Sequence, residues 1–255
     1  MTQSKYLEGF IPYTEEQVRE YTRVGGWLNL TYGDLLDRAA EKNPDKIAVV
    51  DDRTRLTYRE LKDKVDRFAL ALLELGIKPH DRIIIQLPNR YEFVVAFYAM
   101  QKIGAVPVLA VPRHGQREIS QFFKITRACG WILPPRDGKI EFLPLIEKIR
   151  SEVEDLDSVI MPDTDQGLPE FACPMEEMME RAEPEARGPG FLDQYHPDPN
   201  DVAVLIPTGG TTGLPKIVPR THNSLIITNH LISARVASLG DVLLQATPVG
   251  HAMAM

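Results

Sequence analysis

The chain has 255 residues, of which 44% are hydrophobic, so it is long enough to bury a substantial core. Its 29 Lys and Arg residues against 36 Asp and Glu give a formal charge of −7, which argues against a nucleic-acid partner held through its phosphates. No apolar run approaches the roughly 20 residues that a membrane helix requires. The composition therefore predicts no nucleic-acid and no membrane partner, and it favours a small ligand.

The cysteines and histidines show no metal-binding pattern. Cys129 and Cys173 lie far apart with no secretory segment ahead of them, which predicts two free, buried thiols in a cytoplasmic protein. The spacing among five of the histidines is not that of metal ligands, so we assign no metal site to them: His80, His114, His196, His222 and His230.

The first part of the chain alternates between strand and helix patterns. Segments 46–52 and 54–58 predict a hairpin, and a capping box at Thr57 and Glu60 predicts a helix that ends near Gly76. The run RIIIQLP (82–88) predicts a strand, and Asn89 is the expected cap of the helix that follows it.

The alternation continues with a strand at 106–111, a helix at about 117–129 and a strand at 131–134. Such alternation predicts α/β architecture with a mixed, largely parallel sheet buried on both faces. Residues 162–199 carry seven prolines and predict a long connection with one short helix. We therefore divide the chain into a first α/β portion (1–161), a Pro-rich connection (162–199) and a third portion (200–255).

The third portion contains the stretch that points most directly to chemistry. A strand is predicted at 201–207, a helix at 221–240 and a further strand at 241–248, so the run TGGTTGLPK (208–216) is expected between a strand and a helix. Its glycines can bring bare backbone N–H groups against an anion, and its threonines and lysine add further donors. This set suits a phosphate: Thr208, Gly209, Gly210, Thr211, Thr212, Gly213 and Lys216.

Two other interpretations of this run were weighed. An ordinary glycine-rich turn would not explain the hydroxyls and the lysine together. The Walker P-loop does not fit, because Lys216 follows Pro215 and precedes Ile217, where that motif needs Gly-Lys and then Ser or Thr.

The run 208–216 resembles the phosphate loop of the adenylate-forming superfamily, which contains acyl-CoA synthetases, nonribosomal peptide synthetase adenylation domains and beetle luciferases. The segments LTYGDLLDRAAEKNPDKIAVVD (30–51), QKIGAVPV (101–108) and VPRTH (218–222) follow the order of that family. The opening GFIPYTEEQVREYTRVGGW (9–27) and the doubled glycine most resemble stand-alone aryl-acid AMP ligases of the 2,3-dihydroxybenzoate or salicylate type, enzymes of siderophore biosynthesis.

The resemblance implies a two-step ligase that uses ATP with Mg²⁺ and passes the acyl group to the thiol of CoA or of a carrier protein's phosphopantetheine. It implies that Lys216 gives charge support and that His251 borders and gates the acyl pocket. It also places Ala252 where these enzymes commonly have an asparagine that reaches the substrate. A small apolar side chain there removes an expected partner of a 2-hydroxylated benzoate, so aryl acid stays the leading substrate class and a benzoate-like, alicyclic or other unhydroxylated acid is left open.

The resemblance further implies the N-terminal portion of the large domain, mixed sheets flanked by helices, with the C-terminal domain absent. The segment that supplies the main magnesium ligand would be absent with it. We therefore expect a truncated or split chain that is inactive or weakly active without a complementing C-terminal chain. The alternative is a non-catalytic remnant that binds nucleotide or a partner chain.

Overall fold

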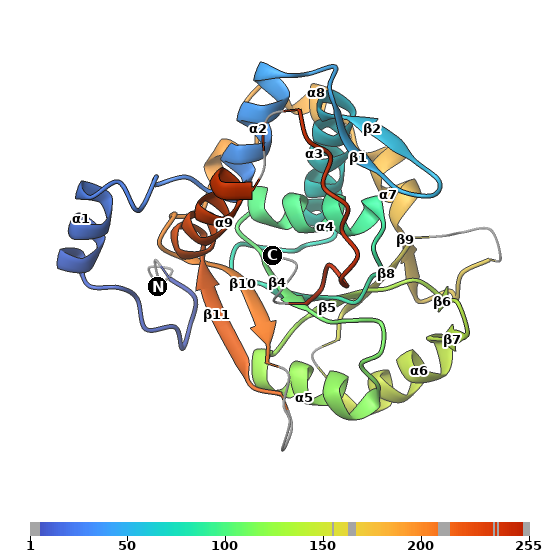
Figure 1. Cartoon of the computed structure of the whole chain (residues 1–255). Coiled ribbons are helices and arrows are strands. Elements are labelled where there is room, and N and C mark those ends of the chain that lie inside the picture. The colour runs from blue at the N-terminus through green and yellow to red at the C-terminus, as the bar shows by residue number, and fades with distance from the viewer. Residues whose placement is uncertain are drawn as a thin grey trace.

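A seven-stranded mixed sheet forms the centre of the molecule (Figure 1). The structure is a computed structural model and describes residues 6–154, 156–162, 167–208, 215–236, 238 and 240–251. The strand order is β11-β10-β4-β3-β5-β8-β9. These strands are β3 (Arg82–Ile85), β4 (Val106–Leu109), β5 (Gly130–Ile132), β8 (Ser158–Met161), β9 (Ala172–Pro174), β10 (Val202–Pro207) and β11 (Ile217–Thr221).

Neighbouring strands are parallel except at one edge, where β11 runs antiparallel to β10. The chain passes from β3 to β4 on one side and then to β5 on the other side of β3. The strand order therefore reverses beside β3. In open α/β sheets, ligands bind outside the carboxyl ends of the strands at such a reversal.

Helices cover both faces of the sheet (Figure 1). One face carries α2 (Tyr32–Lys42), α3 (Tyr58–Glu74), α4 (Tyr91–Lys102), α7 (Met175–Arg181) and α9 (His222–Val236). The other carries α5 (Gln116–Thr126) and α6 (Leu143–Glu152). The remaining elements are α1 (Glu15–Arg23), which buries no residue, α8 (Pro184–Arg187), η1 (Asp193–Tyr195), and the hairpins β1–β2 (Ile47–Val50, Arg55–Thr57) and β6–β7 (Arg136–Asp137, Ile140–Glu141).

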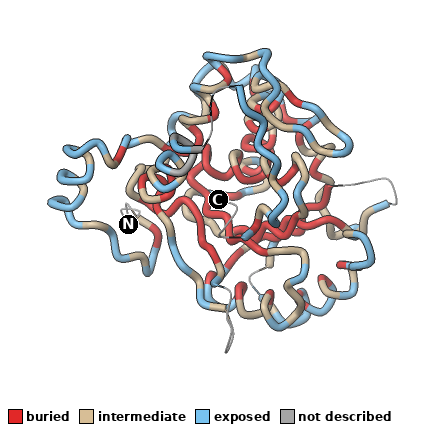
Figure 2. Tube along the Cα trace, in the orientation of Figure 1, coloured by how far each residue is buried: buried red, intermediate tan, exposed pale blue. Residues whose placement is uncertain are grey.

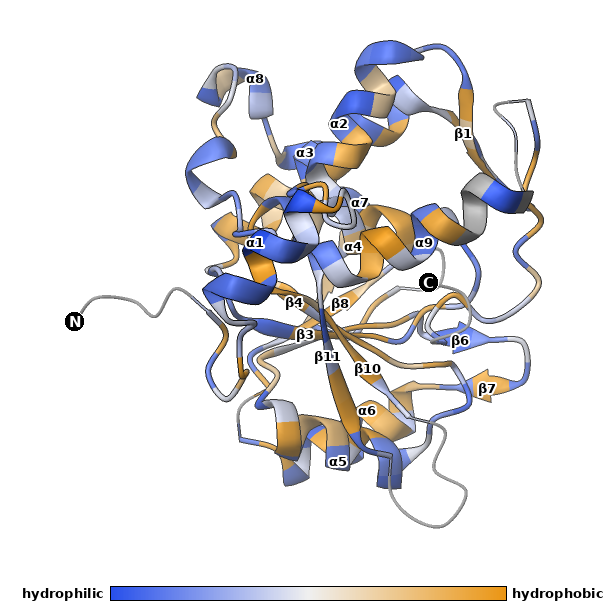
Figure 3. Ribbon diagram, turned by 60° about the vertical axis from the view of Figure 1, so that its left-hand side comes forward, coloured by the Kyte–Doolittle hydropathy of each residue, from blue (hydrophilic) through white to orange (hydrophobic). Residues whose placement is uncertain are grey.

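The three isoleucines of β3 show why this strand lies at the centre. Ile83 and Ile85 point into the core beneath α3 and α4, whereas Ile84 points into the core above α5 and α6, and all three are fully buried. A strand covered on both faces needs an unbroken apolar run rather than an alternating one. Figures 2 and 3 show the buried, hydrophobic sheet between its two helical layers.

Most predicted elements in the first portion are confirmed. β1 and β2 form the expected antiparallel hairpin. The Thr57 hydroxyl accepts a hydrogen bond from Glu60 N at 3.2 Å, and α3 ends before Gly76, which has φ +95°. Part of the segment 162–199 is built into the fold, because β9 joins the sheet and Met175 and Met179 are buried. The division of the chain at 162 and 199 stays a prediction.

Three expectations from the sequence were wrong. The run 208–216 lies between β10 and β11, with the helix starting only at His222, so it is a strand-to-strand connection. Residues 241–248 form no strand, and none of the described strands pairs with them. Asn89 does not cap α4: the cap residue is Arg90, and the Asn89 side chain bonds elsewhere.

In the part of the chain with assigned structure, no helix is long and apolar enough to cross a bilayer.

Candidate functional site

The predicted phosphate loop is closed at its base by backbone and hydroxyl hydrogen bonds. Thr208 N donates to Lys216 O at 2.8 Å, and Lys216 N donates to the Thr208 hydroxyl at 3.1 Å. Below them, Pro207 pairs with Ile217 in the antiparallel ladder. The two ends of the run are therefore held side by side, and Lys216 is exposed. Five of the predicted loop residues lie outside the described residues: Gly209, Gly210, Thr211, Thr212 and Gly213.

The base of the loop lies at the carboxyl end of β10, which pairs in parallel with β4. Thr208 therefore lies at the same edge of the sheet as the segments that follow β3 and β4. This is the edge at which an α/β sheet presents its ligand site.

Arg220 braces the far end of the β10–β11 hairpin against α9. Its guanidinium donates to Ser224 O at 2.9 Å and to the Thr228 hydroxyl at 3.2 Å. The Ser224 hydroxyl also accepts from Thr221 N at 3.1 Å, so the first turn of α9 is fixed to the end of β11. The side chain of Arg220 is committed to this turn and acts on the loop through the position of the strand.

A buried carboxylate ties this hairpin to the rest of the fold. Asp201, just before β10, accepts hydrogen bonds from Leu7 N at 3.1 Å and Val202 N at 2.7 Å, and its other oxygen lies 2.6 Å from His80 Nε2. These contacts join the N-terminal segment, the approach to β3 and the start of β10. Sequence reasoning missed Asp201, and only its place ahead of a strongly apolar strand could have drawn attention to it.

His222, the first residue of α9, belongs to the interior. Its side chain is 1% exposed, and its Nδ1 accepts a hydrogen bond from Tyr32 N at 3.3 Å. Burial is the largest influence on this ring and lowers its pKa to about 4, with Asp201 acting in the opposite direction. His222 is therefore neutral at physiological pH and holds α9 against α2.

The turn that carries His251 lies over the carboxyl ends of β3 and β4. His251 is exposed, and its N–H donates to Pro248 O at 2.9 Å. Gly250 is pressed against the residue after β4, since a Cβ on it would lie 2.6 Å from Ala110 O. A cleft of about 710 Å³ runs beside residues 243–249. Ala252 lies outside the described residues.

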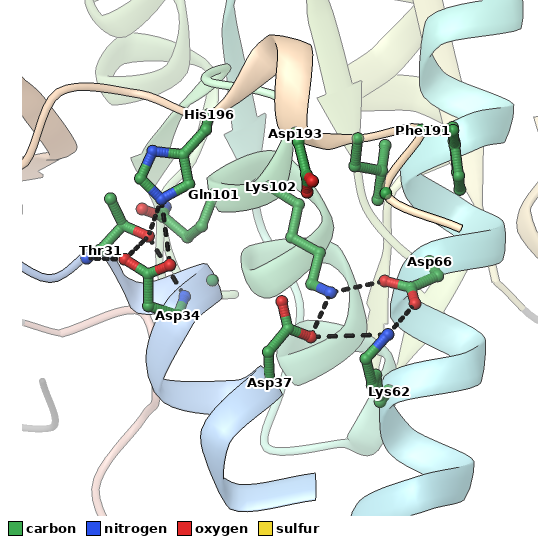
Figure 4. Close-up of a pocket in the computed structure, with 13 residues that line it drawn as sticks. Thr31, Asp34, Asp37, Lys62, Asp66, Gln101, Lys102, Phe191, Asp193 and His196 are labelled. Atoms are coloured by element: carbon green, nitrogen blue, oxygen red, sulfur yellow. Dashed lines mark hydrogen bonds and ion pairs between the residues drawn. The ribbon is translucent and has the colours of Figure 1, made fainter. Parts of the chain in front are cut away.

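A second, smaller pocket lies on the helical side, between α2, α3, α4 and residues 190–196 (Figure 4). Lys102 Nζ lies 2.5 Å from Asp37 and 2.6 Å from Asp66, and Lys62 bonds the other oxygen of Asp66. His196 Nε2 lies 3.0 Å from Asp34 Oδ1. These charges are paired with one another, so the pocket joins helices and is distinct from the edge that carries the loop.

Comparison with known proteins adds to this geometry. The AMP-binding enzyme family matches residues 36–255, most of the chain. The chain belongs to the AMP-binding enzyme family. Among its relatives, the 2,3-dihydroxybenzoate-AMP ligase of Bacillus subtilis (strain 168) is 33% identical over 246 residues, and the match covers 96% of this chain and 43% of that protein. The salicyl-AMP ligase / salicyl-S-ArCP synthetase of Mycobacterium tuberculosis is 32% identical, with 96% and 43% covered.

The same relationship is seen in three dimensions. The apo structure of MbtA from Mycobacterium smegmatis superposes with a TM-score of 0.85 at 34% identity, covering 98% of this chain and 45% of that one. The mixed sheet flanked by helices thus matches the N-terminal part of an adenylate-forming enzyme. The chain spans less than half the length of the relatives that it matches.

Proposed function

We propose that the chain supplies the phosphate loop and one wall of the acyl pocket to an ATP-dependent aryl-acid ligase. In the first step a carboxylate oxygen of the acid attacks the α-phosphorus of ATP, the bond to the β-phosphate breaks, and pyrophosphate leaves with the electron pair. In the second step a thiol attacks the acyl carbon, AMP leaves, and the thiol proton passes to solvent. The acceptor is CoA or the phosphopantetheine of a carrier protein.

The shared edge of the sheet is the observation that carries this proposal. The closed base of the run 208–216 follows β10, and the His251 turn lies against Ala110 after β4, its parallel neighbour. For adenylation the carboxylate of the acid must lie next to the α-phosphate of the nucleoside triphosphate. The two segments are neighbours at one edge, so they can bring these groups together. The family match and the names of the relatives agree with this chemistry.

Lys216 is proposed as charge support for the departing pyrophosphate. Its backbone is fixed by the two hydrogen bonds to Thr208, so its exposed ammonium group is anchored next to the loop. Preorganised donors aimed at developing charge stabilise a transition state without reorganisation. Because the side chain is exposed, we expect Lys216→Ala to slow adenylation by about tenfold to a hundredfold, at or below the usual loss for one such donor.

Among the described residues, no group of three or more His, Cys, Asp or Glu side chains could hold a metal ion. Magnesium would enter with ATP, and the role of the described residues is to bind and orient the phosphates and the acid.

The substrate is proposed to be an aryl acid that lacks a 2-hydroxyl group, because Ala252 can neither donate nor accept a hydrogen bond. His251 is proposed as the gate between this acid and ATP. The carrier-protein acceptor draws support from the salicyl-S-ArCP synthetase among the relatives, whose name describes loading of such a protein.

Acid-dependent ATP–pyrophosphate exchange tests the proposal. The purified 255-residue chain and the same chain joined to any polypeptide encoded directly after Met255 are assayed with benzoate, salicylate and 2,3-dihydroxybenzoate. We expect exchange by the joined protein, strongest with benzoate, and little or none by the chain alone. Absence of acid-dependent exchange from both forms, or of any coding sequence to join, would refute the ligase proposal for this polypeptide.

A second candidate function, binding of a complementing chain, is favoured by one exposed apolar segment. Val242, Leu243 and Leu244 are 95%, 85% and 87% exposed, and no described strand pairs with them. An exposed extended apolar run is a template for strand pairing. We expect the isolated chain to self-associate in sedimentation analysis and a Leu243→Lys, Leu244→Glu variant to remain monomeric; a monomeric unsubstituted chain would refute this candidate.

A further inference from the structure

The side chain of Asn89 reaches across the sheet edge and holds the segment that leads to His251. Its Nδ2 donates to Gln245 O at 3.0 Å and to Thr247 O at 2.9 Å, and its Oδ1 accepts from Val249 N at 2.8 Å. A carboxamide offers two donors and one acceptor oxygen, so both functions of this group are used. Asn89 lies in the loop that leads from β3 to α4, at the strand-order reversal.

Residues 245–249 depend on these bonds for their place in the fold. The long-range hydrogen bonds that the structure describes for this segment all involve Asn89, whereas the Gln245 side chain bonds only within it, to Thr247 at 2.9 Å. The segment lacks the ladder of a paired strand. Asn89, together with the packing of the Val249 side chain against the core, therefore takes the place of that ladder.

Gly250 provides the second point of attachment. A Cβ there would lie 2.6 Å from Ala110 O and 3.1 Å from Ala110 C, so the backbone can approach the end of β4 this closely only without a side chain. The turn is thus held at the end of β3 by Asn89, and at Gly250 its backbone is in close contact with the end of β4. His251 is the next residue.

His114 lies in the turn after β4, which faces the contact between Gly250 and Ala110. The Gln86 carboxamide, fully buried after β3, donates to Val111 O at 3.2 Å and to His114 O at 2.9 Å and fixes that turn. Burial lowers the pKa of His114, Glu118 acts in the opposite direction, and His251 acts in the same direction as burial, so the two imidazoles are within electrostatic reach of each other. The position of the 245–249 segment sets their separation.

We infer that Asn89 is a positioning residue of the acyl pocket, acting through the backbone of residues 245–249 to place His251 and so to set which acid is accepted. This inference rests on the proposed function. Asn89 touches neither reacting group, so its loss is expected to act on the binding of the acid more than on the binding of ATP.

Three variants separate this role from a merely structural one. Asn89→Ala removes all three hydrogen bonds, and Asn89→Asp keeps the acceptor for Val249 N but sets a carboxylate oxygen against two carbonyl oxygens. Gln245→Ala is the matched control, because it removes side-chain bonds that stay within the segment. Amide hydrogen exchange of Val249 in the 255-residue chain and the KM values for acid and ATP, measured in whichever form of the protein carries exchange activity, are the readouts.

We expect Val249 to exchange about tenfold faster in both Asn89 variants. In Asn89→Ala the acceptor of its N–H is gone, and in Asn89→Asp repulsion between the carboxylate and the carbonyl oxygens of Gln245 and Thr247 pushes the segment away from the acceptor that remains. The KM for the acid should rise about tenfold while the KM for ATP changes by less than about twofold, and the Gln245→Ala control should show neither effect. An unchanged exchange rate of the Val249 amide would refute the claim that Asn89 holds residues 245–249 in place. Faster exchange with an unchanged KM for the acid would make Asn89 purely structural and refute its role in specificity. Failure of the proposed function is separate, because it would be seen without any substitution as a lack of exchange activity.

Discussion

The buried histidine at the start of α9 makes the stability of the fold depend on pH in a predictable direction. Burial lowers the pKa of His222 from 6.5 to about 4. Between these two values the unfolded chain binds a proton on this ring that the folded chain does not bind. Stability linked to His222 is therefore complete above pH 6.5 and is lost as the pH falls toward 4.

The size of the effect follows from the shift. One pKa unit corresponds to about 1.4 kcal/mol, so the full displacement is worth about 3.5 kcal/mol, and about 2.5 kcal/mol of it is lost by pH 4.5. His222→Asn retains a group that can accept the hydrogen bond from Tyr32 N but removes the titration. The variant should be less stable than the unsubstituted protein at pH 7.5, because it leaves part of a buried site unfilled.

Urea denaturation at pH 7.5 and 4.5 measures the difference. We expect the stability gap between the unsubstituted protein and His222→Asn to shrink by about 2.5 kcal/mol at the lower pH, since the variant has no ring to protonate. Carboxylates elsewhere titrate in both proteins and cancel in the comparison. Equal pH dependence in the two proteins would show that the ring titrates normally and is not buried as described.

Three further outcomes are expected. Lys102→Met should lower the free energy of unfolding by about 1–2 kcal/mol in urea denaturation, because Asp37 and Asp66 lose their buried cation and keep only Lys62, with Asp37 half exposed to solvent; a loss below about 0.5 kcal/mol would contradict this. Burial raises the pKa of Cys129 to about 11, so iodoacetamide at pH 8 should modify this thiol about a hundredfold more slowly in the folded chain than in urea, and equal rates would refute its burial. Thr57→Ala should cost about 1 kcal/mol through loss of the α3 cap, whereas Thr54→Ala, whose hydroxyl makes no described bond, should cost less.

The parts of the fold that sequence predicts well are those specified by neighbouring residues. The capping box at Thr57, the stop at Gly76 and the apolar run 83–85 each act within a few residues of themselves, and each appears as expected. β11 was not predicted, and its Pro219 is a residue that the interior of a sheet does not accept. Pro219 is tolerated because β11 lies at the edge of the sheet and needs only one hydrogen-bonding neighbour.

The residues of the candidate site also differ in how well the sequence predicts them. The run 208–216 stands out by residue type, because glycine N–H groups, hydroxyls and a lysine are donors that suit a phosphate in any fold. Its place between two strands is not visible in those residues. Asn89 shows the limit most clearly, since the same Asn after a strand and before a helix fits a cap, and only the fold brings residues 245–249 within its reach.

A single polar side chain, rather than a further strand, attaches the approach to His251 to the sheet, because Asn89 bonds residues 245–249. The base of the run 208–216 is held differently, since β10 and β11 pair within the sheet. A paired strand would fix a segment through many bonds and would resist displacement, whereas a segment held by one carboxamide can shift when that group is lost or when a ligand displaces it. The His251 turn can therefore shift relative to the rigid sheet, which is what its proposed role as a gate between an acid and a nucleotide requires.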